Sequence, residues 1–249
     1  MSALSIQDRI NFIRGIDIIA PHGHGVVLVH ADGQDSAVVA AGSGLAFVGG
    51  LSAQSKADVI NSTLFALELA ADKQYDRWNN TSAWLDYYKY VLETVGYVVQ
   101  SFDLAGVSNA NSFLTVDNLL LKLGEVYLSG AELALFTTMV ESLKQARNES
   151  AIRLFDSYSK SSNKAHFQLG VASDHTQDST VLKLGVYRYS TEQNIDIDSV
   201  LFFKFRSQEV EFSAGNLAMV LNNSIYGDIR KEILEQLGPM AKLVKEIKL

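Results

Sequence analysis

The sequence predicts an α+β protein with a central, mainly antiparallel sheet flanked by helical layers. Three observations predict this class. Apolar and polar residues alternate in several short segments between residues 165 and 212, which is the period of a strand with one buried face. Most segments before residue 160 and after residue 224 show helical spacing instead. The links between the alternating segments are short and polar, so neighbouring strands can pair as hairpins.

Composition sets the broad class. A chain of 249 residues with 47% hydrophobic and 20% charged residues can bury one sizeable core. We expect a single domain over residues 1–249: helix-rich from 1 to 160, antiparallel strands from 165 to 212, and C-terminal helices from 224 to 249. A net charge of −7 without a Lys/Arg cluster argues against nucleic acid as a partner. The chain has no cysteine, which excludes disulfides, thiolate metal sites and cysteine nucleophiles.

The N-terminal residues and the hydropathy of the chain bear on targeting. Met1–Gly15 carries three charged residues and no long apolar run, so no signal peptide is visible. No run of about 18 apolar residues occurs either, which excludes a preformed transmembrane helix. Localisation is left open between secretion and a cytoplasmic protein released by a non-classical route.

Near the N-terminus, Leu4–Arg14 has its isoleucines on one side and predicts a short amphipathic helix. Val26–Ala31 and Ala37–Ala41 are expected to pair as strands around an Asp-Gly turn. The glycines of residues 42–50 predict a loop.

Helical spacing then dominates as far as residue 158. Ser55 and Asp58 resemble a capping pair that opens a helix through about Asp72. Thr115 is expected to cap a later helix to about Leu128. The remaining predicted helices are Thr81–Gln100, Ala131–Arg147 and a shorter one through about Tyr158, with Phe102–Asn111 as a loop.

The strand region is expected to hold four strands: Ala165–Ala172, Thr180–Tyr189, Ser199–Arg206 and Glu209–Phe212. Each alternates, which predicts one dry face packed on helices and one wet face. Ser224–Leu237 then predicts a helix, and Pro239 is expected to open a last helical turn that ends at Leu249.

One helix carries an unusual number of aromatic residues at helical spacing: Trp84, Tyr87, Tyr88, Tyr90 and Tyr97. Such residues pack a helix against a core, with their hydroxyl groups at its rim. The alternative is a belt of rings that sits at the level of lipid headgroups.

Catalytic and metal signatures are weak. The sequence holds no phosphate-binding loop, no His-Glu-x-x-His and no nucleophile elbow, so we expect no enzyme, no catalytic residue and no metal. A histidine cluster near the N-terminus could supply metal ligands, although an exposed loop explains it better: His22, His24 and His30, with Asp32. Asp196 and Asp198 are better explained by a charged turn than by a calcium site. Ser173, Asp174 and His175 are contiguous, so they cannot form a catalytic triad.

Two stretches resemble known families. Ser199–Phe205, with the sequence SVLFFKF, resembles a strand region of Cyt-type cytolytic δ-endotoxins. Gly50–Thr63, with the sequence GLSAQSKADVINST, together with Trp84–Gln100 is similar to Evf-type bacterial virulence factors. The two matches touch about half of the chain, and neither is a catalytic signature, so the resemblance concerns scaffold more than mechanism.

The resemblance implies a Cyt/Evf-like domain and a non-enzymatic virulence or toxin-like function at host membranes. A lipid membrane or a lipid is then the expected partner, and assembly of several copies on a membrane is compatible with it. The residues expected to contact membrane or lipid are Trp84, Tyr87, Tyr88, Phe167, Leu184, Phe203 and Phe205. Cysteine acylation, which is associated with Evf-type proteins, is excluded here because the chain has no cysteine. We expect no cofactor other than a non-covalent fatty acid.

Two other functions stay open. The first is a carrier of an apolar ligand, such as a fatty acid, held between helices and sheet. The second is a hydrolase whose site would join His30, His166 or His175 to a serine and a carboxylate.

Overall fold

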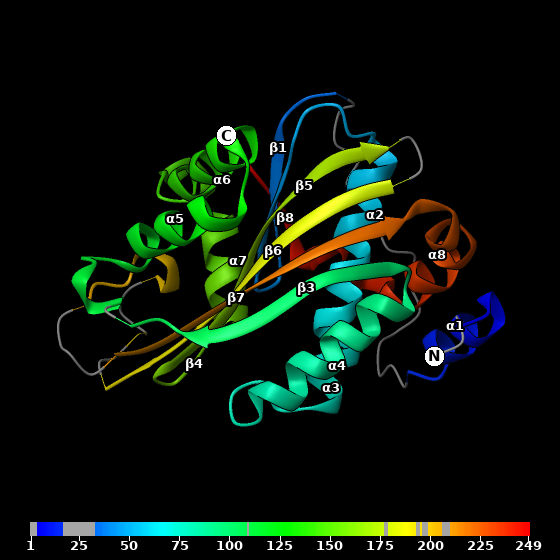
Figure 1. Cartoon of the computed structure of the whole chain (residues 1–249), viewed down its shortest axis with the longest axis horizontal. Helices are drawn as coiled ribbons and strands as arrows, with labels where there is room; N and C mark the ends of the chain where they lie inside the picture. The colour runs from blue at the N-terminus through cyan, green and yellow to red at the C-terminus, as the bar shows by residue number, and fades with distance from the viewer. Residues whose placement is uncertain are drawn as a thin grey trace.

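The computed structural model describes residues 4–16, 33–108, 110–176, 179–192, 195, 199–205 and 210–249. Its centre is an eight-stranded sheet in which seven strands follow the order β3-β7-β6-β5-β2-β1-β8, while the short β4 pairs with β5 (Figure 1). Every pairing is antiparallel except that between β2 and β5. The strands are β1 Ser36–Ala40, β2 Ser43–Phe47, β3 Tyr97–Gly106, β4 Lys160–Ser161, β5 Lys164–Thr176, β6 Ser179–Thr191, β7 Val210–Asn222 and β8 Val244–Ile247.

Helices gather at opposite ends of this sheet and on its two opposite faces (Figure 1). We call the face that carries Phe167, Tyr187 and Tyr189 the α5 face, and the face that carries Gln168 and Leu184 the α4 face. The α5 face is covered by α5 Val116–Tyr127, α6 Gly130–Ser142 and α7 Glu149–Ser159. The α4 face is covered by α2 Ala53–Leu64, its π-helical continuation Phe65–Ala71, the short α3 Asp72–Gln74, α4 Thr81–Thr94 and α8 Asn223–Leu237, with α1 Ile6–Arg14 packed on α8.

The arrangement confirms the predicted fold class, a mainly antiparallel sheet between helical layers. The expected wet face, however, is wrong for the central strands. Leu182, Leu184 and Val186 of β6 lie in the core on the α4 face, whereas Tyr187 and Tyr189 lie in a second core on the α5 face. A sheet packed on both faces buries its polar alternates as well as its apolar ones.

Gln168 and His166 show how β5 tolerates this burial. Both alternate with the apolar residues of Ala165–Ala172, which predicts the wet face for them, yet each is only 1% exposed. The Gln168 Oε1 atom accepts hydrogen bonds from the Ser43 hydroxyl at 3.1 Å and the Tyr88 hydroxyl at 3.0 Å. Partners on β2 and α4 therefore satisfy the amide oxygen that burial takes away from water.

The strand predicted at Ser199–Arg206 is wrong. Val200–Phe202 forms a 3-10 turn, because the Asp156 carboxylate of α7 accepts hydrogen bonds from the Ser199 hydroxyl and the Val200 amide, both at 3.0 Å. Lys204 then makes an isolated bridge with Thr115, while residues 206–209 lie outside the described part. Phe203 thus fills the core from a turn. The predicted short strand at Glu209–Phe212 is the start of the 13-residue β7.

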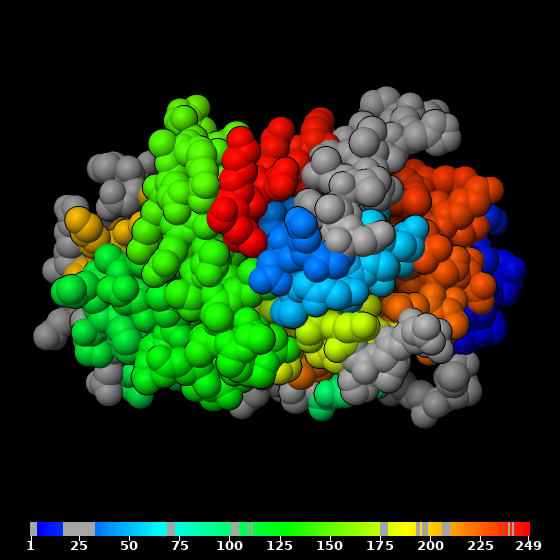
Figure 2. All heavy atoms as spheres, turned by 90° about the horizontal axis from the view of Figure 1, so that it is seen from above, coloured from blue at the N-terminus to red at the C-terminus, as the bar shows by residue number. Residues whose placement is uncertain are grey.

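Three other predictions change at element boundaries. The helix expected over Thr81–Gln100 stops at Thr94, because Gly96 adopts a φ of +109° and turns the chain into β3. The loop expected over residues 42–50 contains β2, whose five residues are all buried. The expected C-terminal helix from Pro239 is instead a 3-10 turn followed by strand β8, which pairs with β1. Figure 2 shows this red C-terminal segment lying between the green helices and the blue β1.

Thr115 occupies the expected N-cap position of α5, but its side chain makes no cap hydrogen bond. At the start of α8 the Asn222 side chain, which was not predicted as a cap, accepts from the Ile225 amide at 3.0 Å. The capping pair of α2 lies three residues earlier than expected. Ser52, not Ser55, is the N-cap, because its hydroxyl accepts from the Ser55 amide at 3.0 Å. The predicted strand Val26–Ala31 lies outside the described residues.

Glu132 ties the start of α6 to the sheet. Its carboxylate accepts hydrogen bonds from the Ser129 amide at 2.8 Å, the Lys183 ammonium at 2.7 Å and the Ser173 hydroxyl at 3.1 Å. Burial acts to raise the pKa of Glu132, but the bonds from Lys183 and Ser129 outweigh it, so the pKa lies below its ordinary value.

Glu132→Gln is expected to destabilise the protein by about 2 kcal/mol, because the charge-assisted bonds to Lys183 and Ser129 are lost. A depressed carboxyl pKa contributes stability that is complete above the ordinary carboxyl value and disappears as the pH falls through the folded value. Urea denaturation at neutral and acidic pH measures both effects. Glu141→Gln, an exposed position on the same helix, is the control. Equal stability of the two variants at neutral pH would contradict this role for Glu132.

Candidate functional site

Helix α4 divides the predicted aromatic residues between its two sides. Trp84 and Tyr88 point inward and are fully buried, whereas Tyr87 is half-buried and Tyr90 is 45% exposed. Tyr97 is not on the helix; it is the first residue of β3 and is also buried. The sequence therefore predicted one aromatic stripe, and the structure contains an inner pair and an outer pair.

The outer pair belongs to a larger surface feature, which we call the aromatic strip: Phe12, Tyr90, Tyr87 and Tyr75. Its rings follow one another from α1 across α4 to the turn after α3. Ring centroids lie 5.6 Å apart for Phe12 and Tyr90, 5.9 Å for Tyr90 and Tyr87, and 5.5 Å for Tyr87 and Tyr75. Partial burial and the neighbouring phenols Tyr90 and Tyr75 raise the pKa of Tyr87, so its hydroxyl stays neutral. The strip offers amphipathic rings at the surface, with no rearrangement of the fold.

The other residues expected to contact lipid lie inside the protein. Phe167, Leu184 and Phe203 are at most 2% exposed, like Trp84 and Tyr88. Phe205 is half-buried and packs its ring against Phe203 at 6.3 Å between centroids. Of the seven residues, Tyr87 alone belongs to the aromatic strip, and the five buried ones can meet a bilayer only if a helical layer leaves the sheet.

The inner aromatic pair surrounds a buried histidine. The Trp84 ring stacks on Tyr88 at 5.1 Å between centroids, and His166 meets the edge of Trp84 at 4.7 Å. Burial, together with the nearby cations Arg77 and Arg188, lowers the pKa of His166 to about 3. His166 is therefore a neutral core residue, and its ring contacts are to tryptophans.

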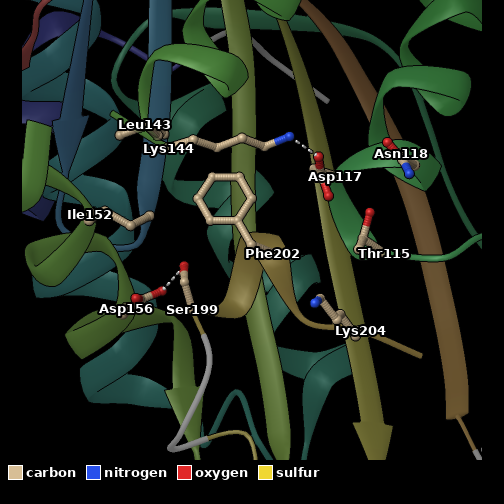
Figure 3. A pocket seen from close by; sticks show the side chains of 10 residues that line it. All are labelled: Thr115, Asp117, Asn118, Leu143, Lys144, Ile152, Asp156, Ser199, Phe202 and Lys204. Atoms are coloured by element: carbon tan, nitrogen blue, oxygen red, sulfur yellow. Dashed lines mark hydrogen bonds and ion pairs between the residues drawn. The ribbon is translucent and has the colours of Figure 1, made fainter. Parts of the chain in front are cut away.

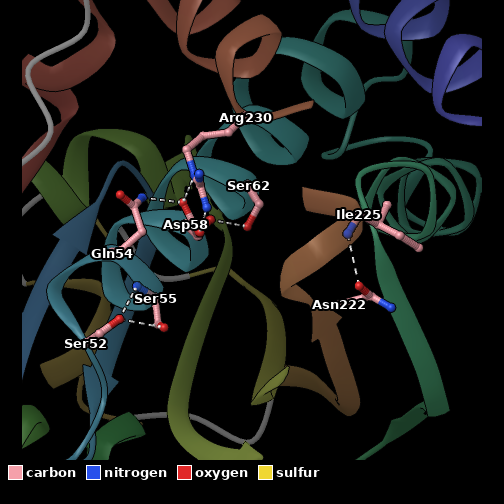
Figure 4. Close-up of polar contacts among 8 residues, drawn as sticks. All are labelled: Ser52, Gln54, Ser55, Asp58, Ser62, Asn222, Ile225 and Arg230. Carbon is pink, nitrogen blue, oxygen red and sulfur yellow. Dashed lines mark hydrogen bonds and ion pairs between the residues drawn. The ribbon is translucent and has the colours of Figure 1, made fainter. Parts of the chain in front are cut away.

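A polar cluster joins α2 to α8 on the same layer (Figure 4). The Asp58 carboxylate, only 3% exposed, accepts from the Arg230 Nε and Nη2 atoms, both at 2.8 Å, and from the Gln54 amide at 2.8 Å. Asp58 and Arg230 are 172 residues apart in sequence. This bidentate ion pair holds two helices of the α4-face layer together.

Helix α1 is attached to that layer by two arginines. The Arg9 guanidinium, which is largely buried, donates to the carbonyl oxygen of Glu93 at 2.9 Å at the end of α4. Arg14 pairs with Glu232 of α8 at 3.0 Å. Helix α1 therefore depends on polar contacts with both α4 and α8, and it contributes Phe12 to the aromatic strip.

Described residues line two cavities on the α5-face side of the sheet. One, of about 520 Å³, lies among α5, α6, α7 and the 3-10 turn (Figure 3). The other, of about 260 Å³, lies between α5 and strands β3, β6 and β7. Its wall includes the hydroxyl groups of Tyr127 and Tyr187, 2.9 Å apart, beside Gly185.

The remaining sequence candidates do not form a site in the described residues. His22, His24, His30 and Asp32 lie outside the described part, as do Asp196 and Asp198. The Ser173 hydroxyl donates to Glu132, which gives it a structural role at the start of α6. The side chain of His175 is not described. In the ranges that the structure describes, no group of three or more His, Cys, Asp or Glu side chains is placed to hold a metal.

Sequence reasoning missed two members of the aromatic strip, Phe12 and Tyr75. Tyr75 follows the helix α2–α3 and Phe12 lies in α1, so their proximity to Tyr87 depends on how three segments pack. Their half-buried placement at the edge of the core has no periodic signal of its own. The Asp58–Arg230 pair was missed for the same reason, since each residue looks like an ordinary charge on a helix.

Together these features define an α+β protein with a sheet between two helical layers, an external aromatic strip and a polar cluster in the layer beneath it. None of the described helices is long and apolar enough to cross a bilayer.

No family model matches the chain, and no curated protein matches it. Solved structures similar to it include a delta-endotoxin, with 13% identity, coverage of 83% of this chain and 89% of that one, and a TM-score of 0.41. The Evf virulence factor has 12% identity, covers 94% and 90%, and has a TM-score of 0.40. The activated Cyt2Ba monomer from Bacillus thuringiensis subsp. israelensis has 9% identity, covers 54% and 79%, and has a TM-score of 0.34. These are the kinds of protein that the sequence resembles, and such a likeness does not assign a function.

Proposed function

We propose that this protein is a toxin-like protein that acts on membranes physically, without catalysis, and that it first binds them through the aromatic strip. The observation that carries the proposal is the strip itself: Phe12, Tyr75, Tyr87 and Tyr90 form a continuous row of half-buried and exposed rings. Tyrosine rings favour the membrane–water interface because the ring is apolar and the hydroxyl stays hydrated.

The net charge of the chain favours binding to zwitterionic over anionic lipid headgroups. A net charge of −7 repels anionic headgroups, and Asp86 is exposed on the outer side of α4 beside the strip. Binding by aromatic rings does not need anionic lipid. We therefore expect zwitterionic phosphatidylcholine vesicles to bind the protein better than vesicles rich in phosphatidylserine.

The central strands supply a second step. Strands β5, β6 and β7 are each 13 residues long, more than the roughly 10 residues that cross a bilayer when tilted. Leu184 of β6 and Leu217 of β7 carry an apolar α4 face that α2, α4 and α8 now cover. Separation of this helical layer would present that face to lipid, and the strip lies on the outside of the same layer.

Vesicle flotation and dye leakage test the first step. The double variant Tyr87→Ser/Tyr90→Ser is expected to lose most flotation with phosphatidylcholine vesicles and most leakage. The matched control is Leu114→Ser/Val126→Ser, which removes two aliphatic side chains, each 79% exposed, on the other side of the sheet. Loss of binding in both variants would show nonspecific apolar adsorption, and unchanged binding in the tyrosine variant would remove the strip from the account.

A second candidate function, a carrier of an apolar ligand, is favoured by the smaller cavity. Its wall is mostly apolar and includes Val107, Leu123 and Ala214, while the paired hydroxyls of Tyr127 and Tyr187 could hold a polar head. At about 260 Å³ it is slightly smaller than the usual range for ligand pockets, so it would take a short chain or part of a longer one.

Native mass spectrometry of the protein mixed with decanoic acid tests the carrier. Gly185→Ala is expected to abolish the adduct, because the added Cβ would lie 2.2 Å from the Tyr187 hydroxyl and 2.6 Å from the Tyr127 hydroxyl and would displace both. Tyr127→Phe keeps the shape and removes one hydroxyl, so it is expected to weaken the adduct only in part. An adduct of equal intensity in all three proteins would exclude this cavity as the site.

A further inference from the structure

The larger of the two cavities lies on the α5 face of the sheet, away from the aromatic strip. Helix α5 supplies one wall, the end of α6 and the middle of α7 supply another, and the 3-10 turn Val200–Phe202 closes the floor (Figure 3). Its volume of about 520 Å³ is in the range of small-molecule sites. From its charges, hydrogen-bonding groups and aromatic ring, we infer that this cavity binds a neutral sugar ring, a pyranose residue of a glycan.

The charges of the cavity oppose a strongly charged ligand of either sign. Lys144 reaches across it to Asp117, with 2.5 Å between Nζ and Oδ2. Lys204 and Asp156 lie on other sides (Figure 3). A polyanion would meet the two carboxylates and a polycation would meet the two lysines, and each contact costs energy in a partly enclosed site. A neutral ligand with many polar groups meets neither penalty.

The hydrogen-bonding groups that line the cavity are suited to the hydroxyl groups of a ligand. Asp156 uses its Oδ1 atom for both Ser199 and Val200, and among the described residues its Oδ2 atom has no hydrogen-bond partner. The Thr115 hydroxyl, although at the N-cap of α5, makes no cap bond, and the exposed Asn118 amide has no hydrogen bond within the described ranges. A carboxylate accepts only, a hydroxyl does both, and an amide does both, which suits a row of sugar hydroxyls.

An aromatic ring supplies the apolar contact. The Phe202 side chain is half-buried, and the Lys144 ammonium lies 5.3 Å from its centroid. Leu143 and Ile152 extend this apolar surface on the α6 and α7 side. A pyranose ring has a face of C–H groups that packs on an aromatic ring while its hydroxyl groups point outward to polar side chains. The cavity combines both requirements within one site.

This site is independent of the aromatic strip, because the two lie on opposite faces of the sheet. A protein that binds sugars here and membranes at the strip could recognise a glycan on the surface that it acts on. The two activities can therefore be lost separately, and the experiment below keeps them apart.

Saturation-transfer difference NMR with methyl pyranosides of glucose, galactose, mannose and N-acetylglucosamine tests the inference. At least one pyranoside is expected to receive saturation, strongest at the ring C–H protons of one face. Asn118→Ala, at an exposed position that carries no packing, is expected to weaken its affinity about tenfold. Phe202→Ala is expected to abolish the signal. Tyr90→Ala removes an aromatic ring from the strip and is expected to leave sugar binding unchanged while it weakens vesicle flotation.

Three results would overturn the inference. The first is no saturation transfer to any of the four pyranosides. The second is transfer that survives in both Asn118→Ala and Phe202→Ala, which would place sugar binding elsewhere. The third is broadening of the phosphorus resonance of inorganic phosphate, lost in Lys144→Ala, with no sugar signal, which would make the cavity an anion site. None of these results bears on vesicle binding through the strip.

Discussion

Acidification from neutral pH is expected to destabilise the protein strongly through His166. The unfolded histidine has a pKa of 6.5, and burial lowers the folded value to about 3. Between these two pH values the imidazole of His166 is protonated in the unfolded chain and neutral in the folded chain. The stabilising contribution of the neutral form is therefore complete above pH 6.5 and falls as the pH drops toward 3. The difference is on the order of 5 kcal/mol over the whole window. Urea midpoints measured at half-unit steps of pH would show it.

The matched variant is His166→Phe, which keeps an aromatic ring against Trp84 and removes the titrating group. Its stability is expected to change little between pH 6.5 and 5, because Glu132, whose pKa is lowered, stays ionised over this range. Below that window both proteins lose stability as carboxylates are protonated. A wild-type midpoint as steady between pH 6.5 and 5 as that of the variant would contradict a buried neutral His166.

The second large effect is expected from Asp58→Ala, which should lower the free energy of unfolding by about 3 kcal/mol. The substitution leaves Arg230, which is only 31% exposed, without its anion and takes a hydrogen-bond acceptor from Gln54. A double-mutant cycle with Arg230→Ala would measure the interaction energy between Asp58 and Arg230. The losses of stability in the two single variants are expected to sum to far more than the loss in the double variant.

An exposed ion pair on α8, the helix that carries Arg230, provides the control. Lys231 and Glu235 of α8 lie 3.7 Å apart, with 81% and 56% of their side chains exposed. Lys231→Ala is expected to leave the free energy of unfolding unchanged, because water and salt screen exposed ion pairs. If Asp58→Ala were as mild as Lys231→Ala, the cluster in Figure 4 would not hold the layer together.

Both perturbations act on the layer that must separate in the proposed mechanism. His166 lies beneath α4, and Asp58 joins α2 to α8. Dye release from phosphatidylcholine vesicles is therefore expected to be faster at pH 5 than at pH 7, and faster for Asp58→Ala than for wild type at either pH.

Much of the fold could be predicted from local pattern. The alternation in β5 and β6 and the helical spacing of α5 and α7 are local properties, and each appears near its expected position. The prediction at Ser199–Arg206 failed because that segment alternates like a strand, while its conformation depends on Asp156 of α7, 43 residues away. The sequence pattern does not reveal β3, because Tyr97–Gln100 continues the apolar spacing of α4 and the positive φ of Gly96 leaves no periodic signal.

The burial of both sheet faces could not be seen in the sequence. Gln168 and His166 are polar, so a strand pattern places them in water, and their partners Tyr88 and Trp84 lie about 80 residues away. The candidate site was predicted in part. Tyr87 was named for membrane contact and lies in the aromatic strip, whereas Trp84 and Tyr88, one helical face away, became core. Which side of an aromatic helix faces the sheet depends on packing that periodicity alone does not supply.

The central claim is that the α4-face layer leaves the sheet when the protein binds a membrane. Because the chain has no cysteine, a spin label reacts only at a cysteine that is introduced by substitution. Labels at Asp86→Cys on α4 and Asp174→Cys at the end of β5 are exposed, and a control pair joins Asp174→Cys to Glu141→Cys on α6. Double electron–electron resonance is expected to show that phosphatidylcholine vesicles lengthen the first distance and leave the second unchanged. Vesicle-bound protein in which both distances match those in solution would contradict the account.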